Sequence, residues 1–121
     1  MSKSENLEGI LKDLEASVPE IQAAAIVSVE GLPIAAQLPA EVDETRVAAM
    51  TAAMLSLGER AAQELGKGEL EQVFISGKDG YILVTSAGPN AVLTVSTTKN
   101  VKLGLIFLDM RRSAQRIAEL I

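Results

Sequence analysis

The side chains that most often perform catalysis near neutral pH are missing from this sequence. It contains neither histidine nor cysteine, which excludes a Ser-His-Asp triad, a thiolate nucleophile, a zinc–thiolate centre and an iron–sulfur cluster. Two stretches combine glycine with lysine, at residues 66–68 and 76–80. Neither has the G-x-x-x-x-G-K-[ST] spacing of a phosphate-binding loop, so we interpret both as turns.

Acidic residues are plentiful, but their positions do not predict a catalytic pair. Glu5, Glu8, Asp13 and Glu15 lie on the polar faces of one predicted helix, where no apolar pocket would raise a carboxyl pKa. We therefore expect no catalytic residue, no cofactor site, no metal site and no enzymatic activity.

Composition favours a small interaction module. The 121 residues are 48% hydrophobic, with a formal net charge of −5 and only two Phe and one Tyr. An acidic chain with so few aromatic rings is a poor match for nucleic acid or anionic membranes. The longest nearly apolar run, residues 103–108, is too short to span a bilayer, and residues 1–6 begin no signal peptide. We expect a single cytoplasmic domain over residues 1–121, without membrane insertion.

The first part of the chain predicts a helix followed by a hairpin. Apolar residues recur at helical spacing over residues 2–18, with Ser2 and Glu5 as a possible capping box. The strand over residues 23–29 turns at Glu30-Gly31, a pair typical of two-residue hairpin turns. The returning strand, residues 32–38, contains Pro33, which has no N–H and therefore indicates a sheet edge.

The rest of the chain predicts two helices around a three-stranded meander. Asp43 can cap a middle helix that reaches residue 65, and Asn100 can cap a last helix that reaches residue 121. The strands between them cover residues 70–76, 81–87 and 91–97. The strands at 23–27 and 81–85 are nearly continuously apolar, as in strands covered on both faces. The order α-β-β-α-β-β-β-α thus predicts a three-layer α/β/α domain of the α+β type, with one five-stranded antiparallel sheet.

Three passages in this order resemble the Roadblock/LC7 domain family. They are residues 23–35, a small-residue strand turning at an acidic-Gly pair, the Ala-rich residues 46–55, and residues 100–105 at the start of the last helix. The resemblance extends from about residue 7 to residue 121 and is closer to the compact prokaryotic members than to the dynein light chains. It implies a profilin-like sheet of order 2-1-5-4-3, with the third strand and the middle helix at a dimer interface. It also implies a non-catalytic homodimer or heterodimer that binds small Ras-like GTPases, as a regulator or a scaffold.

The middle helix carries an apolar arc wider than one packing surface needs. One lobe is bulky and comprises Val47, Met50, Met54, Leu57, Ala61 and Leu65. The adjoining lobe is mostly small and comprises Ala48, Thr51, Leu55, Gly58 and Ala62. We predict that the bulky lobe packs on the sheet and that the small lobe forms the dimer interface. The alternative is that one chain covers the whole arc.

The third strand is apolar on both faces, through Leu70 and Phe74 on one and Val73 and Ile75 on the other. As an unprotected edge it would be prone to aggregation. Pairing with a second copy across a two-fold axis removes that edge, so we add Val73 and Ile75 to the predicted dimer interface. A central position within one chain would also remove it.

The outward face of the middle helix is the predicted docking site for a Ras-like GTPase. We assign to it Ala49, Ala52, Ala53, Ser56 and Arg60. An ordinary solvated helix face would have the same composition, because alanine is the best helix former. A GTPase activator can also insert an arginine into its partner's active site. Surface arginines are common, so we do not assign this role to Arg46 or Arg60.

These patterns leave three functional hypotheses. The first is a homodimer that binds a Ras-like GTPase and modulates its nucleotide cycle, with activation of hydrolysis as one form of that modulation. The second is a structural adaptor without effect on hydrolysis. The third is a small-ligand sensor, for which no pocket is visible in the sequence. Leu105 and Leu108 fall off the main apolar face of the last helix, and we expect them to contact the first helix rather than a partner.

Overall fold

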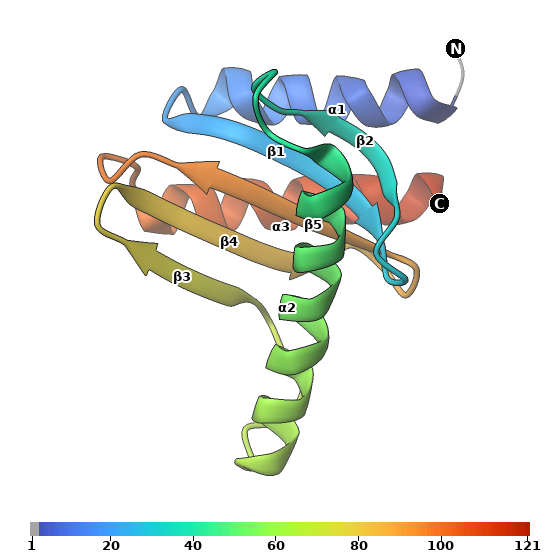
Figure 1. Ribbon diagram of the computed structural model, residues 1–121, viewed down its shortest axis with the longest axis vertical. Coiled ribbons are helices and arrows are strands. Elements are labelled where there is room, and N and C mark those ends of the chain that lie inside the picture. Colours follow the sequence, from blue (N-terminus) through green and yellow to red (C-terminus); the bar gives the residue numbers. More distant parts are fainter. Residues whose placement is uncertain (1–2) are drawn as a thin grey trace.

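Three helices and five strands follow one another within residues 3–121, the part of the chain that the computed structural model describes (Figure 1). Their bounds are α1 (Lys3–Ser17), β1 (Ile21–Ser28), β2 (Pro33–Gln37), α2 (Glu44–Glu64), β3 (Val73–Gly77), β4 (Gly80–Ser86), β5 (Ala91–Thr97) and α3 (Leu103–Leu120). The predicted order α-β-β-α-β-β-β-α is confirmed. Ser2 of the predicted capping box lies outside the described residues.

All five strands form one antiparallel sheet in the order β2-β1-β5-β4-β3. Pro33 begins β2 at one edge of this sheet, as predicted from its missing N–H. β3 forms the opposite edge, so the alternative of a central third strand is wrong.

The helices make two layers on opposite faces of the sheet. α1 and α3 lie side by side on one face, because each turns an apolar stripe towards the strands. Their largest fully buried side chains include Leu7, Leu11, Ile106 and Ile117, which share a core with Ile26, Leu83 and Leu93. α2 lies alone on the other face (Figure 1), and the predicted three-layer architecture is confirmed.

α2 crosses the strands instead of running along them, and its C-terminal half projects past β3 (Figure 1). Asp43 caps its start as predicted: the carboxylate Oδ1 accepts a hydrogen bond from the N–H of Arg46 at 3.2 Å. Gly66, with a φ of 69°, follows the last turn. The C-terminal half of α2 therefore extends past the β3 edge of the sheet (Figure 1).

Several local predictions need correction. The first hairpin has a three-residue loop instead of a two-residue turn: Ser28 N–H donates to the Leu32 carbonyl, and Gly31 takes a φ of 95°. The last helix is not capped by Asn100, because it begins after Lys102, and no side chain caps it.

β3 begins at Val73, three residues later than predicted. Leu70 precedes the strand and packs with Val73 against Gly58 of α2, so the two residues share a face instead of lying on opposite ones. No helix within residues 3–121 combines the length and the hydrophobicity that crossing a membrane requires.

Candidate functional site

The small lobe of α2 packs on the sheet of its own chain, which reverses the predicted orientation of this helix. Ala48, Thr51 and Leu55 are buried. Gly58 lies so close to β3 that an added Cβ would stand 2.7 Å from Val73 Cγ2, and Ala62 is half-buried. The prediction that these five residues form the dimer interface assumed that they face outward. In the structure they face inward because a helix of small residues can approach a sheet face that already carries bulky ones, namely Val27, Val84 and Val92.

The bulky lobe consequently faces solvent. Met50, Leu57 and Leu65 have 50%, 69% and 73% of their surface exposed. Ala61 is also exposed, while Val47 and Met54 are half-buried. These six residues form a continuous line along one side of α2, which we call the α2 stripe. An apolar line of this length is typical of a protein interface.

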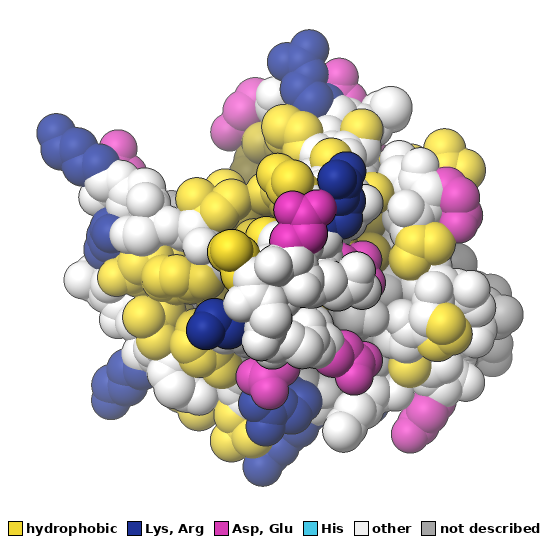
Figure 2. All heavy atoms as spheres, turned by 90° about the horizontal axis from the view of Figure 1, so that it is seen from below, with side chains coloured by type: hydrophobic (Ala, Val, Ile, Leu, Met, Phe, Trp, Pro, Cys, Tyr) yellow, Lys and Arg dark blue, Asp and Glu magenta, His cyan; other side chains and the backbone are white. Residues whose placement is uncertain are grey.

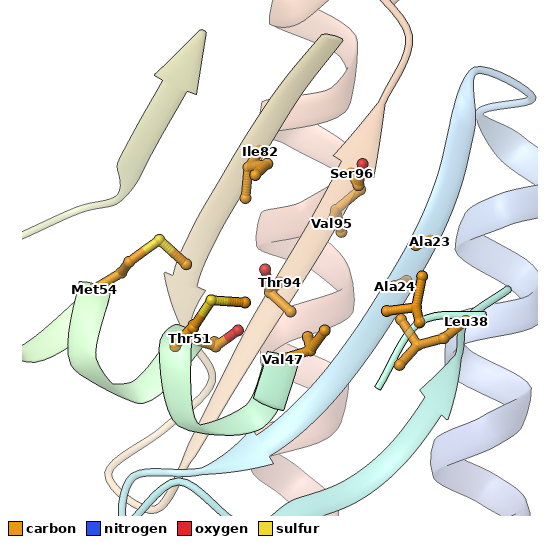
Figure 3. Close-up of a pocket in the computed structure, with 12 residues that line it drawn as sticks. Ala23, Ala24, Leu38, Val47, Thr51, Met54, Ile82, Thr94, Val95 and Ser96 are labelled. Carbon is orange, nitrogen blue, oxygen red and sulfur yellow. The ribbon is translucent and has the colours of Figure 1, made fainter. Parts of the chain in front are cut away.

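A groove separates the α2 stripe from the exposed part of the sheet (Figure 3). Its volume is about 220 Å³, and Val47, Met50 and Met54 line it from the helix side. From the strands, Ile82, Ser96 and Ala23 line it. Thr51, Thr94 and Ser96 supply the few polar atoms. No pattern in the sequence indicated this groove. The expectation that helices cover both faces of β4 is wrong at Ile82, which is exposed.

The exposed part of the sheet continues to the free edge at β3. Ile75 stands opposite Ile82 in the β3–β4 register, and both are exposed on the side that α2 covers elsewhere. On the other side, Phe74 stacks on Tyr81 at a centroid distance of 5.2 Å and meets Phe107 edge-on at 6.1 Å. Figure 2, seen from the end to which α2 projects, shows hydrophobic side chains gathered mostly on one side of this view, among charged and polar ones. The free strand edge and the α2 stripe thus leave exposed apolar surface at this end of the molecule.

The predicted docking residues lie on the outward side of α2, away from the sheet. Ala49, Ala53, Ser56 and Arg60 are exposed, whereas Ala52 is half-buried beside the β1–β2 loop at Gly31. The Arg60 guanidinium forms an ion pair with Glu64 at 3.5 Å. This side of α2 is therefore small in its side chains and carries its charges towards the projecting end.

The described residues bring no catalytic constellation together. No three acidic side chains among residues 6–121 are grouped closely enough to hold a metal ion. Burial raises the pKa of the Glu15 carboxyl, but Glu15 lies on α1, on the other face of the sheet from α2 and the groove. The arrangement can bind a protein surface, and we find no group in it positioned for acid–base work.

One signal for the projection of α2 was present in the sequence. A helix of 21 residues is about 31 Å long, whereas five strands about 4.8 Å apart span only about 20 Å. A helix that crosses such a sheet must extend beyond it. The crossing direction itself depends on side-chain packing between the two layers, which residue spacing does not reveal.

The sequence of residues 8–97 matches the model of the Roadblock/LC7 domain. The chain belongs to the Roadblock/LC7 domain family. A relative among curated proteins, the uncharacterized protein MJ1340 of Methanocaldococcus jannaschii, is 43% identical over 97 residues, which cover 80% of this chain and 84% of that protein. The family predicted from the hairpin, the Ala-rich helix and the start of α3 is therefore confirmed.

Solved structures place this Roadblock/LC7 chain among profilin-like folds. MglB of Myxococcus xanthus superimposes with a TM-score of 0.86 at 20% identity, covering 95% of this chain and 94% of that one. A chain of the LokiProfilin2–rabbit actin complex superimposes with a TM-score of 0.70 at 17% identity, covering 100% of both. At these identities the likeness concerns the fold, and the predicted profilin-like architecture is confirmed.

Proposed function

We propose that this Roadblock/LC7 chain is a cytoplasmic, non-catalytic homodimer that binds a Ras-like small GTPase and modulates its nucleotide cycle. The observation that carries the proposal is the projecting half of α2, whose stripe of bulky apolar residues has no sheet of its own to cover. The Roadblock/LC7 resemblance, which implies dimers that bind such GTPases, supplies the kind of partner.

The dimer joins two copies at their free edges. When two β3 strands pair antiparallel across a two-fold axis, the unpaired N–H and carbonyl groups of both edges find partners. The same operation carries the projecting half of each α2 over the neighbouring sheet. Leu57, Ala61 and Leu65 of one copy then cover the groove beside Met50 and Ile82 of the other. The interface in this arrangement uses Ile75 and the α2 stripe, while Val73 lies partly beneath its own Gly58.

The GTPase docks on the outward sides of the two α2 helices, which the dimer brings near each other. Ala49, Ala53 and Ser56 present little more than backbone and methyl groups, so a partner can approach closely. Glu59 and Arg60 at the margin set its orientation through charge complementarity. The chain acts by position: it changes hydrolysis or exchange by binding one arrangement of the GTPase's switch loops more tightly than the other.

The test uses the small Ras-like GTPases encoded by the organism that carries this gene, each loaded with GDP or with a non-hydrolysable GTP analogue. We expect micromolar or tighter binding that depends on the nucleotide, and a change in the rate of hydrolysis. Ala53→Arg should abolish binding by steric clash without changing the melting temperature or the dimer, because Ala53 is exposed. Ala16→Arg, at an exposed position of α1, is the matched control and should bind as the wild type does.

Three results would contradict this assignment in different ways. If no GTPase of the panel binds in either nucleotide state, the proposed partner is wrong. If one binds and the double variant Ala49→Arg/Ala53→Arg still binds it, the docking surface lies elsewhere. A partner that binds while its hydrolysis and exchange rates stay unchanged would favour the structural adaptor instead.

The groove supports one competing function, a small-ligand sensor. Its apolar lining and volume of about 220 Å³ suit a small hydrophobic molecule, although most ligand pockets are larger, at about 300–1,000 Å³. Native mass spectrometry of protein purified from its own cells separates the two: a retained small molecule favours the sensor, and a dimer of unmodified mass favours the interface. GTP itself should not bind the isolated protein in calorimetry.

A further inference from the structure

The outer side of α3 carries two leucines that the fold covers only in part. Leu105 and Leu108 have 46% and 40% of their surface exposed, so contacts within the chain, including any with α1, leave a large part of each side chain free. α3 already buries its opposite side, through Ile106, Met110 and Ile117. The α2 stripe and the β3 edge lie elsewhere, so neither the proposed dimer nor the proposed docking surface explains these leucines.

The two leucines begin a regular line along α3. Leu105, Leu108, Arg112, Gln115 and Glu119 follow one another at steps of three, four, three and four residues, and all five are exposed. This is the a/d spacing of a coiled-coil seam, which accepts the side chains of a second helix laid alongside. The surface therefore has the form of a helix-binding seam, apolar in its first half and polar in its second.

Positive charge surrounds the second half of the seam. Arg111 and Arg116 occupy positions that flank the second half of the a/d seam, and Asp109 flanks its first half; side-chain charge at such positions determines partner choice. Within the described residues, Arg116 forms an ion pair with Asp13 at 3.4 Å, whereas Arg111 and Arg112 form none. Residues 99–121 contain five basic and two acidic side chains, and residues 1–98 contain six basic and fourteen acidic ones. The basic charge of this acidic protein is thus concentrated around α3.

This charge pattern selects among the possible occupants. A second copy of α3 laid parallel and in register would place arginine against arginine, which is unfavourable. A flat anionic membrane would meet α1 as well as α3, because the two helices lie side by side. The exposed side of α1 includes Asp13 and carries Glu8 and Glu15 at its margins, which anionic lipid would repel. Only a narrow acidic partner meets the arginines while avoiding these carboxylates.

We propose that the outer side of α3 binds an acidic amphipathic helix of a partner protein, with apolar residues against Leu105 and Leu108 and carboxylates against Arg111 and Arg112. This site goes beyond the proposed function and does not depend on it. The family match covers residues 8–97. α3 and its seam therefore lie outside the matched part of the chain.

The direct test measures binding of a designed helix to the full-length protein. The probe is a fluorescein-labelled peptide of three heptads with leucine at a and d and glutamate at e and g. Its counterpart has lysine at e and g. By fluorescence anisotropy we expect the glutamate peptide to bind in the micromolar range, and to weaken in 0.5 M NaCl because salt screens exposed charges. The lysine peptide should bind at least about tenfold more weakly.

Three variants assign the binding to the seam. Leu105→Ser/Leu108→Ser should weaken the glutamate peptide at least about tenfold, because each serine removes a half-exposed leucine from the contact. Arg111→Glu/Arg112→Glu should reverse the preference and bind the lysine peptide better. Leu32→Ser removes a leucine that is even more exposed, at 64%, from the β1–β2 loop on the α2 side of the sheet, and should bind as the wild type does.

The outcomes separate the possible occupants. Equal affinity for both peptides, or wild-type affinity in the leucine double variant, overturns the proposal. So does sedimentation with phosphatidylglycerol vesicles that is lost in the leucine double variant, because it assigns the seam to a membrane. Reversal of peptide preference in the arginine double variant supports it, since loss of folding cannot create affinity for the opposite charge.

Discussion

Leu57→Ser tests the role of the projecting helix without disturbing the fold of the single chain. Leu57 has 69% of its surface exposed, so the serine variant should keep nearly the same melting temperature as a monomer. In the proposed dimer, however, Leu57 is buried against the groove of the other copy. The substitution should therefore weaken association far more than it weakens folding.

The size of the effect follows from the exposed fraction. Full burial of a leucine side chain contributes about 1.5–3 kcal/mol, so burying the exposed part of Leu57 contributes about 1–2 kcal/mol per copy. A two-fold interface contains this contact twice. The variant should lose about 2–4 kcal/mol of association free energy, which raises the dimer Kd by about 30- to 700-fold.

Sedimentation equilibrium over a range of concentrations measures this change, since the chain has a mass of 12.8 kDa and the dimer twice that. Leu32→Ser is the matched control: Leu32 is 64% exposed, in the β1–β2 loop beside Ala49 and Ala52, across α2 from the stripe. Its dimer Kd should not change. The reasoning is refuted if Leu57→Ser dimerises like the wild type, or if both serine variants weaken the dimer equally.

Three further predictions concern single positions. Ile75→Lys should raise the dimer Kd by more than about 100-fold, because an unpaired charge is costly in a buried interface. Sedimentation equilibrium measures this Kd. Val73→Lys is a less specific test of the interface, because Val73 also packs on Gly58 within its own chain. Gly58→Ala should lower the free energy of unfolding by up to about 2 kcal/mol in urea, since overpacking against Val73 Cγ2 exceeds the gain in helix propensity; Gly9→Ala in α1, where an added Cβ meets nothing within 4 Å, should raise it instead. Glu15→Gln should raise the melting temperature slightly at pH 7 and leave it unchanged at pH 3. Burial raises the pKa of the Glu15 carboxyl in the folded state, so ionisation of this carboxyl destabilises the fold as pH rises through that pKa. Glutamine cannot ionise and avoids this loss. An equal gain at both values would contradict this last cause.

The parts of the fold that depend on local chemistry were predictable from the sequence. Pro33 indicated an edge strand because a missing N–H has the same consequence in any sheet. Asp43 indicated the start of α2 because its carboxylate satisfies a free N–H wherever a helix begins. Both predictions concern a residue and its immediate backbone, and both are confirmed.

The orientation of α2 depended on a relation between two layers, and the sequence of the helix could not settle it. Both lobes are apolar, and the larger one was the natural choice for the core. The sheet face that α2 covers already holds Val27, Val84 and Val92. The smaller lobe of α2 therefore packs against this face, and the larger lobe remains exposed to solvent. A similar limit holds for Leu105 and Leu108: their spacing shows that they share a side of α3, but not that 46% and 40% of their surface stay exposed.

The two edges of the sheet differ in a way that limits how many chains can join. β3 leaves its outer backbone groups unpaired, whereas β2 is only five residues long, begins with a residue that has no N–H, and has α1 packed against it. A sheet with two equally receptive edges could add chain after chain and grow into a ribbon or a fibril. When two copies pair through β3, each uses its one receptive edge. The two outer edges of the combined sheet are then both β2. For the proposed β3–β3 pairing, growth by strand addition therefore ends at two copies, since Pro33 leaves β2 a poor edge for pairing.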